Sequence, residues 1–337
     1  MILNIPIKKG GKTMKKKLLG VLLAATMVAG LVFGCGSEAP ADVADGGDND
    51  TIKIGFSSKT NADAFLKQLV DAAEEEAEKL GVEIVMTDAG GDVNKQISDC
   101  ETLIAQQVDA LIVIPQDMEG SAPVVGMAKE ADIPVIVCNA DIADKSYDAF
   151  VGSTDQEAGE ILGTWFNDNV PEKSGICIIE GPMGQSGQVG RYAGFEAAGT
   201  LDNFNVLSEQ TANWKRDEAM ALAEDWLVTY GNDLKAIICE NDDMALGALS
   251  ACLAAGRNDV VIGGVDGLSD AVLSVQEGKL GVSVLQDSEG QGRGSVDVAV
   301  KIVKGEKYES DIRIPFRAIT KDNVDAYLEG GVDAITK

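Results

Sequence analysis

The chain has 337 residues, carries 28 Lys and Arg against 55 Asp and Glu, contains no histidine, and has a formal net charge of −27. This length allows about two domains of ~150 residues each, and a hydrophobic content of 45% is typical of a globular protein rather than a disordered one. The negative charge argues against partners such as nucleic acid, whose phosphates require a basic surface, and against docking of the folded part on anionic lipid. The lack of histidine excludes Ser-His-Asp and Cys-His catalysis and every zinc site that needs imidazole.

Residues 1–34 have the composition of a secretory signal peptide. They contain six Lys and no acidic residue, and an apolar run of about 16 residues extends from Leu18 to Phe33. This run is shorter than the ~20 residues of a membrane-spanning helix. Its end, Leu31–Cys35, resembles the lipobox, which implies that Cys35 is acylated and becomes the first mature residue. A membrane anchor with an unrelated cysteine is the alternative, and Met14 is a second candidate for the start of translation.

Residues 35–50 are small, polar and acidic, which predicts a flexible tether between the membrane and the folded part. Removal of the six lysines of the signal would leave the mature chain with a net charge of −33. The four Asp of the tether do not follow the spacing of a calcium loop, and we expect neither a metal nor a cofactor. The five cysteines beyond Cys35 have no C-x-x-C spacing and are expected to be buried free thiols.

From Thr51 onwards, short β-rich runs alternate with longer amphipathic ones. The helix expected over Asn61–Leu80 carries apolar residues at three- and four-residue spacing and is followed by Gly81 as its C-cap. Further helices are expected at 95–107, 156–168, 188–199, 216–229, 243–255 and 269–277, and strands at 52–56, 82–86, 110–114, 134–138, 176–179, 205–207, 236–239, 260–265 and 282–285. Repeated βαβ units imply parallel sheets, and the number of strands favours two doubly wound, Rossmann-like α/β domains.

Polar side chains follow the apolar strands at the point where each strand ends. Ligands of doubly wound folds bind beyond the carboxyl ends of the strands. Amides and carboxylates there can bridge neighbouring hydroxyl groups, and an aromatic ring can stack on C–H surfaces. Asn, Asp and Ser also favour turns and helix caps, which is the alternative for each residue taken singly. The predicted binding residues are Ser57, Asn61, Phe65, Asn139, Asp141, Gln185, Gln188, Trp214, Asn241, Asp266 and Gln286.

Three segments resemble the ribose/galactose-binding family of type I periplasmic binding proteins, namely Glu240–Leu249, Gly263–Gly267 and Gly81–Pro134. The similarity extends from about Thr51 to Arg317, and the Glu209–Asp217 region is similar to inositol-binding members. The resemblance implies two αβ lobes joined by three crossovers, near Ser153–Asp155, Gln286–Ser288 and Ile312–Pro315. The N-terminal lobe would comprise 51–153 plus 287–313, and the C-terminal lobe 154–286 plus 314–337.

Site residues follow from this resemblance position by position. Ser57 and Phe65 match a first-lobe loop that contacts the sugar, and Trp214 matches an aromatic of the second lobe. Asn241 matches the sugar-binding Asn of the Asn-Asp-x-Met-Ala segment, and Asp266 matches the Asp that follows the G-x-D strand. Gln286 matches a hinge Asn or Gln, and Arg191 matches a structural Arg of an R-x-x-G-F pattern.

Two positions depart from the ribose-binding pattern. Asn139-Ala140 stands where ribose binders carry Asp-Arg, and Val189 stands where they carry a second Arg. Each lost arginine removes a rigid fork for sugar oxygens, so the ligand is not expected to be ribose itself. Asp141, Gln185, Ser186 and Gln188 are candidate replacements.

The resemblance implies an extracytoplasmic, lipid-anchored, monomeric protein that captures a pentose, hexose or cyclitol and delivers it to an ABC importer. The alternative is a sensor that presents the same ligand to a chemoreceptor or sensor-kinase ectodomain. A transcription regulator is disfavoured, because a signal peptide stands where a DNA-binding domain would be. An enzyme is disfavoured because first-turn dipole stabilisation explains Asp243 better than glycoside hydrolysis by a pair of acids does.

Overall fold

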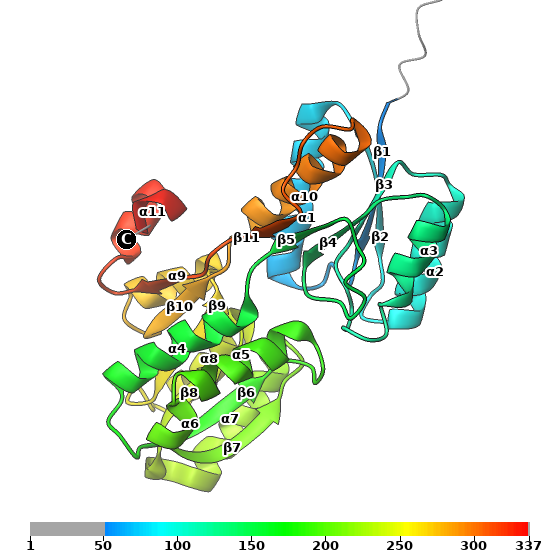
Figure 1. Ribbon diagram of the computed structural model, residues 1–337. Coiled ribbons are helices and arrows are strands. Elements are labelled where there is room, and N and C mark those ends of the chain that lie inside the picture. Colours follow the sequence, from blue (N-terminus) through cyan, green and yellow to red (C-terminus); the bar gives the residue numbers. More distant parts are fainter. Residues whose placement is uncertain (1–50, 336–337) are drawn as a thin grey trace, which may run out of the picture. The chain divides into compact units, whose positions relative to one another are not determined.

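The structure, a computed structural model, describes residues 51–335, and these form two β-sheets with helices on their faces (Figure 1). The first sheet has the strand order β11-β5-β4-β3-β1-β2, and all of its strand pairs are parallel. Its elements from the first part of the chain are β1 (Lys53–Ser58), α1 (Ala64–Leu80), β2 (Glu83–Asp88), α2 (Val93–Ala105), β3 (Ala110–Val113), α3 (Pro123–Glu130), β4 (Val135–Asn139) and β5 (Ala149–Gly152).

The second sheet has the order β12-β10-β9-β8-β6-β7. Its pairs are parallel except at one edge, where β12 runs antiparallel to β10. Its elements before the chain returns to the first sheet are α4 (Asp155–Asn169), β6 (Gly175–Glu180), α5 (Ser186–Ala197), α6 (Thr200–Asn203), β7 (Asn205–Thr211), α7 (Arg216–Tyr230), a 3₁₀ turn (Gly231–Asp233), β8 (Leu234–Cys239), α8 (Asp242–Ala254), β9 (Val261–Asp266), α9 (Ser269–Gln276) and β10 (Val282–Leu285).

The chain passes between the two sheets three times, after β5, after β10 and after β11. The last segments are α10 (Ser288–Val303), β11 (Asp311–Arg313), β12 (Arg317–Thr320), α11 (Val324–Gly330) and a 3₁₀ turn (Val332–Ile335). The predicted architecture of two doubly wound α/β lobes is therefore confirmed.

Local sequence signals explain where α1 begins and ends. The carboxylate of Asp63 accepts a hydrogen bond from the backbone N–H of Leu66 at 2.9 Å, and Gly81 ends the helix with φ 68°. The helix then packs against α10 on one face of the first sheet, while α2 and α3 cover the other (Figure 1). A side chain at Gly292 of α10 would meet the carbonyl of Leu69 at 2.2 Å, so this glycine permits the close packing of the two helices.

The sequence had not identified α3, β5, α10 or the antiparallel β12. α3 has only eight residues and no side-chain cap, and β5 has four residues. α10 carries three glycines and small polar residues in its first half, which obscure its apolar stripe. These elements form because tertiary packing supplies the stability that their local signals lack.

The five cysteines expected to be buried free thiols are confirmed as such: Cys100, Cys138, Cys177, Cys239 and Cys252. Burial raises the pKa of Cys100 to about 11 and that of Cys138 to about 12. A thiol with a pKa this high is protonated and unreactive, so these side chains serve as small apolar core residues.

Candidate functional site

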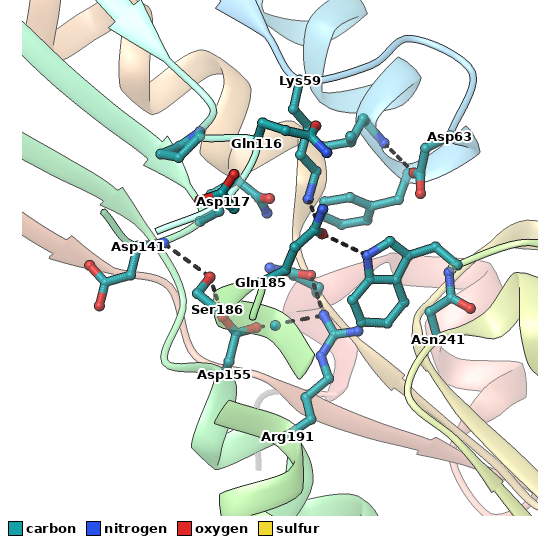
Figure 2. Close-up of a pocket in the computed structure, with 18 of the residues that line it drawn as sticks. Lys59, Asp63, Gln116, Asp117, Asp141, Asp155, Gln185, Ser186, Arg191 and Asn241 are labelled. Carbon is teal, nitrogen blue, oxygen red and sulfur yellow. Dashed lines mark hydrogen bonds and ion pairs between the residues drawn. The ribbon is translucent and has the colours of Figure 1, made fainter. Parts of the chain in front are cut away.

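A pocket of about 540 Å³, including its space open to solvent, lies beyond the carboxyl ends of the strands of both sheets (Figure 2). Parallel strands direct their carboxyl ends towards one edge of each sheet, which brings residues distant in sequence to one place. Eight of the predicted residues line it: Phe65, Asn139, Asp141, Gln185, Trp214, Asn241, Asp266 and Gln286.

Asn139 and Asp141 are held by residues far away in the chain. Asn139 has a φ of 66°, in the left-handed region that Asn tolerates, and its Nδ2 donates to Oε1 of Gln291 at 2.9 Å. The backbone N–H of Asp141 donates to Oγ of Ser186 at 3.1 Å, across from the first sheet to the start of α5 (Figure 2). The backbone of Asp141 is thereby held beside α5, while its carboxylate points away from the other labelled pocket residues and pairs with Lys145 at 2.6 Å (Figure 2).

Trp214 is positioned by an unusual backbone and by a glycine. Its φ is 63°, and its Nε1 donates to Oε1 of Gln185 at 2.8 Å. A Cβ at Gly181 would lie 2.0 Å from the indole ring, so the loop after β6 must carry glycine there. Strained backbone conformations of this kind are typical of functional sites, where the surrounding structure holds them.

Arg191 of α5 lies at the centre of the pocket wall and is buried. One of its Nη atoms is 3.6 Å from Oδ1 of Asp155 and 4.0 Å from Oδ1 of Asp266, and donates to Oε1 of Gln286 at 3.2 Å. Its guanidinium carbon lies 5.4 Å from the centre of the Trp214 ring. A single cation thus links two carboxylates, an amide and an indole.

The backbone of α4 makes this position of Arg191 possible. A Cβ at Gly159 would lie 2.0 Å from the carbonyl oxygen of Arg191, so the two helices can approach only with glycine at this point. The other Nη of Arg191 donates to the carbonyl of Glu240, at the end of β8. Arg191 is therefore held between Asp155 at the start of α4 and Glu240 at the end of β8.

Burial dominates the electrostatics of these groups. Desolvation raises the pKa of Asp155 and raises that of Asp266 well above its usual range, although Arg191 opposes both shifts. Desolvation likewise lowers the pKa of Lys59, against the attraction of Asp63 and Asp155. Because charge is costly here, ligand hydroxyl groups that hydrogen-bond to these side chains would replace lost hydration.

The tripeptide Glu240–Asp242 organises three parts of the site. Asn241 lines the pocket, and its Oδ1 caps α8 by accepting from the N–H of Met244 at 2.9 Å. Glu240 Oε2 accepts from the N–H of Gly181 at 2.7 Å. Asp242 Oδ2 accepts from the N–H groups of Gly267 and Leu268, both at 2.9 Å, and from the hydroxyl of Ser283 at 2.7 Å. Glu240 thus holds the loop after β6, which packs on the ring of Trp214, and Asp242 holds the turn that follows Asp266.

Three predicted residues lie outside the pocket lining. Ser57 is fully buried in β1, and Asn61 precedes the helix cap with its Oδ1 buried and without a partner among the described residues. Gln188 is turned inwards, where its Nε2 donates to Glu180 at 3.1 Å. Ser57 is turned away by the pleat of β1 and Gln188 by the phase of α5, while Asn61 lies in the loop between β1 and α1.

Ser186, a candidate replacement for the lost arginines, also lines the pocket. The other lining residues were not among the predicted ones: Lys59, Asp63, Leu66, Pro115, Gln116, Asp117, Ala140, Asp155, Gly187 and Arg191. Gln116 and Asp117 follow β3, so the strand-end rule could have found them. Asp155 lies at a predicted crossover, but no local signal marks it as facing the pocket. Arg191 was expected to be structural, and the structure places it both in the framework and on the pocket surface.

The chemistry of the lining suits a neutral, hydroxyl-rich molecule. Carboxylates and amide oxygens accept hydrogen bonds, Arg191 and Lys59 donate them, and the rings of Phe65 and Trp214 provide apolar surface. Within residues 51–335, no group of three or more Cys, Asp or Glu side chains is placed to hold a metal ion.

Comparison with known proteins agrees with this architecture. Residues 54–307 match the periplasmic binding protein domain. The xylitol-binding protein of Mycolicibacterium smegmatis is 33% identical over 312 residues, which cover 92% of this chain and 88% of that protein. The ribose import binding protein of Bacillus subtilis is 30% identical over 91% of this chain and 99% of its own length. A solute-binding protein of an ABC transporter from Bacillus halodurans, solved with bound myo-inositol, is 35% identical, with a TM-score of 0.79 over 83% of this chain and 98% of that one.

Proposed function

Because this chain belongs to the periplasmic binding protein family, we propose that it is a solute-binding protein that captures a sugar or sugar alcohol and delivers it to an ABC importer. The observation that carries this proposal is the pocket at the strand ends of both sheets, lined by carboxylates, amides, Arg191 and Trp214. Relatives that bind xylitol and myo-inositol support a polyol or cyclitol in particular.

The predicted residues that line the pocket are proposed to contact the ligand. Asp266, Asn241 and Asn139 accept or donate hydrogen bonds to hydroxyl groups, and Trp214 covers a C–H face. Arg191 and Asp155 join this proposed set, because both line the same pocket. A protein that only binds and releases its ligand needs no nucleophile, and we propose that this chain is not an enzyme.

Delivery implies a position outside the cytoplasmic membrane. We propose that residues 1–34 are removed and that Cys35 carries a lipid anchor, with 35–50 as a tether; all of these residues lie outside those that the structure describes. No helix within 51–335 is long and apolar enough to cross a membrane. The lobe boundaries given above and a monomeric state complete the proposal. Substitution of Cys35 by Ser should release the protein from the membrane fraction.

A ligand screen tests the proposed function. A ligand selective for the native state raises the melting temperature, by an amount equivalent to about 3 kcal/mol at one hundred times its Kd. The mature protein should respond to at least one of the pentoses, hexoses, pentitols and cyclitols, with reversible binding by calorimetry and no hydrolysis of glycosides. If no member of these classes binds, the proposal is wrong.

A further inference from the structure

A second cavity adjoins the ligand pocket, and we call it the outer chamber. It measures about 1090 Å³, including its space open to solvent, and is thus larger than the pocket itself. Its lining combines the loop after β1, the turn before α2 and the loop before α7. Five residues line both cavities: Lys59, Asp63, Gln116, Gln185 and Trp214.

Side chains, rather than backbone, separate the two spaces. Oε1 of Gln185 accepts from Nε1 of Trp214 at 2.8 Å and from Nζ of Lys59 at 3.4 Å, which joins the loops of the two lobes (Figure 2). Within residues 51–335, the Nε2 of Gln185 and two of the three hydrogens of the Lys59 ammonium have no protein acceptor. Hydrogen-bond donors are therefore available at the boundary of the chamber.

The charges around the outer chamber cancel. Its three basic residues, Lys59, Lys215 and Arg216, are matched by three acids, Asp63, Asp217 and Asp243. Arg216 pairs with Asp243 at 2.7 Å, and Lys215 pairs with a carboxylate just outside the chamber at 2.7 Å. An anionic group such as a phosphate would have to compete with these carboxylates, so the chamber favours a neutral occupant.

The remaining surface has the character of a sugar site. Ala62, Pro182 and the indole of Trp214 offer apolar contact. At Gly90 and Gly91, both with positive φ, an added Cβ would meet no atom within 4 Å, so the wall is open there. Apolar surface beside free donors, without net charge, suits a hydroxylated ring.

We propose that the outer chamber is a second subsite and that the ligand is a polyol or sugar carrying a neutral hydroxylated substituent in glycosidic linkage. The first ring would occupy the inner pocket, and its substituent would extend past Gln185 into the chamber. This inference rests on the proposed function, since it requires that the inner pocket bind the first ring.

Calorimetry with matched ligands tests the second subsite. The probes are myo-inositol, xylitol and ribose, each compared with the set of its mono-O-galactosyl regioisomers. For the parent that binds, at least one isomer should bind ten-fold or more tightly than the parent. If every isomer binds more weakly than its parent, the second subsite is wrong and the proposed function stands. If none of the three parents binds, the ligand found in the screen replaces them as parent, and only failure of the whole screen makes the proposed function itself wrong.

A variant tests whether the higher affinity of the galactosyl isomer arises from contacts in the outer chamber. Ala62→Trp fills the chamber without entering the set of residues that line the inner pocket. It should abolish the preference for the galactosyl isomer and leave the affinity for the parent within about two-fold. Ala105→Trp, at the exposed end of α2, is the matched control and should change neither affinity. An undiminished preference in Ala62→Trp would overturn the proposal.

Discussion

Asp266 combines a rare backbone conformation with a buried carboxylate. Its φ is 138°, its side chain lies 4.0 Å from an Nη of Arg191, and burial raises its pKa well above its usual range. The desolvation cost of a buried carboxylate is offset only if other groups donate hydrogen bonds to it. A ligand hydroxyl group is the partner that the proposed function supplies.

We therefore expect Asp266→Asn to weaken binding of the ligand found in the screen by about ten- to a hundred-fold, because a hydrogen bond to a charged group contributes about 1.5–3 kcal/mol. Asn has the size and shape of Asp and leaves the backbone at φ 138° under the same strain, so the fold should be retained. Calorimetry measures the affinity, and the melting temperature of the unliganded variant provides the control. An unchanged Kd would remove Asp266 from the binding site.

At the scale of elements, loops of the second lobe depend on the end of β8. Glu240 holds the loop after β6 through Gly181, and Asp242 holds the turn between β9 and α9 through Gly267 and Leu268. Hydrogen bonds from the end of β8 thus hold two of the loops around the site. Substitutions that break these hydrogen bonds should weaken ligand binding even though the substituted residues do not contact the ligand.

Gly181→Ala tests the tie to Trp214. The new Cβ would lie 2.0 Å from the indole, which must move and take its apolar surface with it. We expect affinity to fall at least ten-fold and the indole fluorescence response to ligand to change. Gly126→Ala in α3 is the control, since its added Cβ would meet no atom within 4 Å and the residue lies outside the pocket lining. Equal affinities in the two variants would contradict this role of Gly181.

Asp242 gives a pH prediction for the same element. Burial raises its pKa to about 6, from about 3.9 in an unfolded chain, although its hydrogen bonds with Ser283, Leu268 and Gly267 oppose the shift. Between these values the folded state binds the proton more tightly, so the contribution of Asp242 to the free energy of unfolding is greatest at low pH and is lost as pH rises through about 6. Over the full interval this contribution is about 3 kcal/mol.

The unliganded protein should consequently melt at a higher temperature at pH 5 than at pH 7.5. Asp155, Glu240 and Asp266 shift in the same direction and contribute with the same sign. Asp242→Asn keeps an acceptor for the three donors and should reduce the difference by several degrees, whereas Asp243→Asn, half-buried and paired with Arg216, should not. If the difference in melting temperature between pH 5 and pH 7.5 is the same in both variants, Asp242 is excluded as the source of the pH dependence.

At the scale of the whole molecule, the net charge of −33 expected for the mature chain is a cost to the folded state. Like charges confined to a compact body repel one another, and salt screens them, since the Debye length falls from ~30 Å at 0.01 M to ~8 Å at 0.15 M. The cost is spread over the surface, where exposed ion pairs contribute little individually.

We expect the melting temperature to rise between 10 and 150 mM sodium chloride at pH 7.5. Sodium sulfate at equal ionic strength is the control, because equal effects of the two salts indicate screening rather than a specific effect of the anion. A melting temperature that falls with added salt would show that surface ion pairs outweigh the repulsion.

The sequence by itself determined the alternation of strands and helices, the two-lobed fold and most of the pocket-facing strand ends. It could do so because hydrophobic periodicity is local, and because the carboxyl ends of parallel strands must meet at one edge. The side chains of Ser57 and Gln188 turn away from that edge, since their direction depends on pleat and helix phase.

The number of charged residues follows from the sequence, but only the tertiary structure decided where they lie relative to one another. Arg191, expected to be structural, is brought beside Asp155, Asp266 and Trp214, which lie 23 to 75 positions away. The outer chamber likewise arises where loops of both lobes meet. Burial and pairing depend on residues distant in sequence, so composition shows how many charges there are, and the fold shows which of them face a ligand.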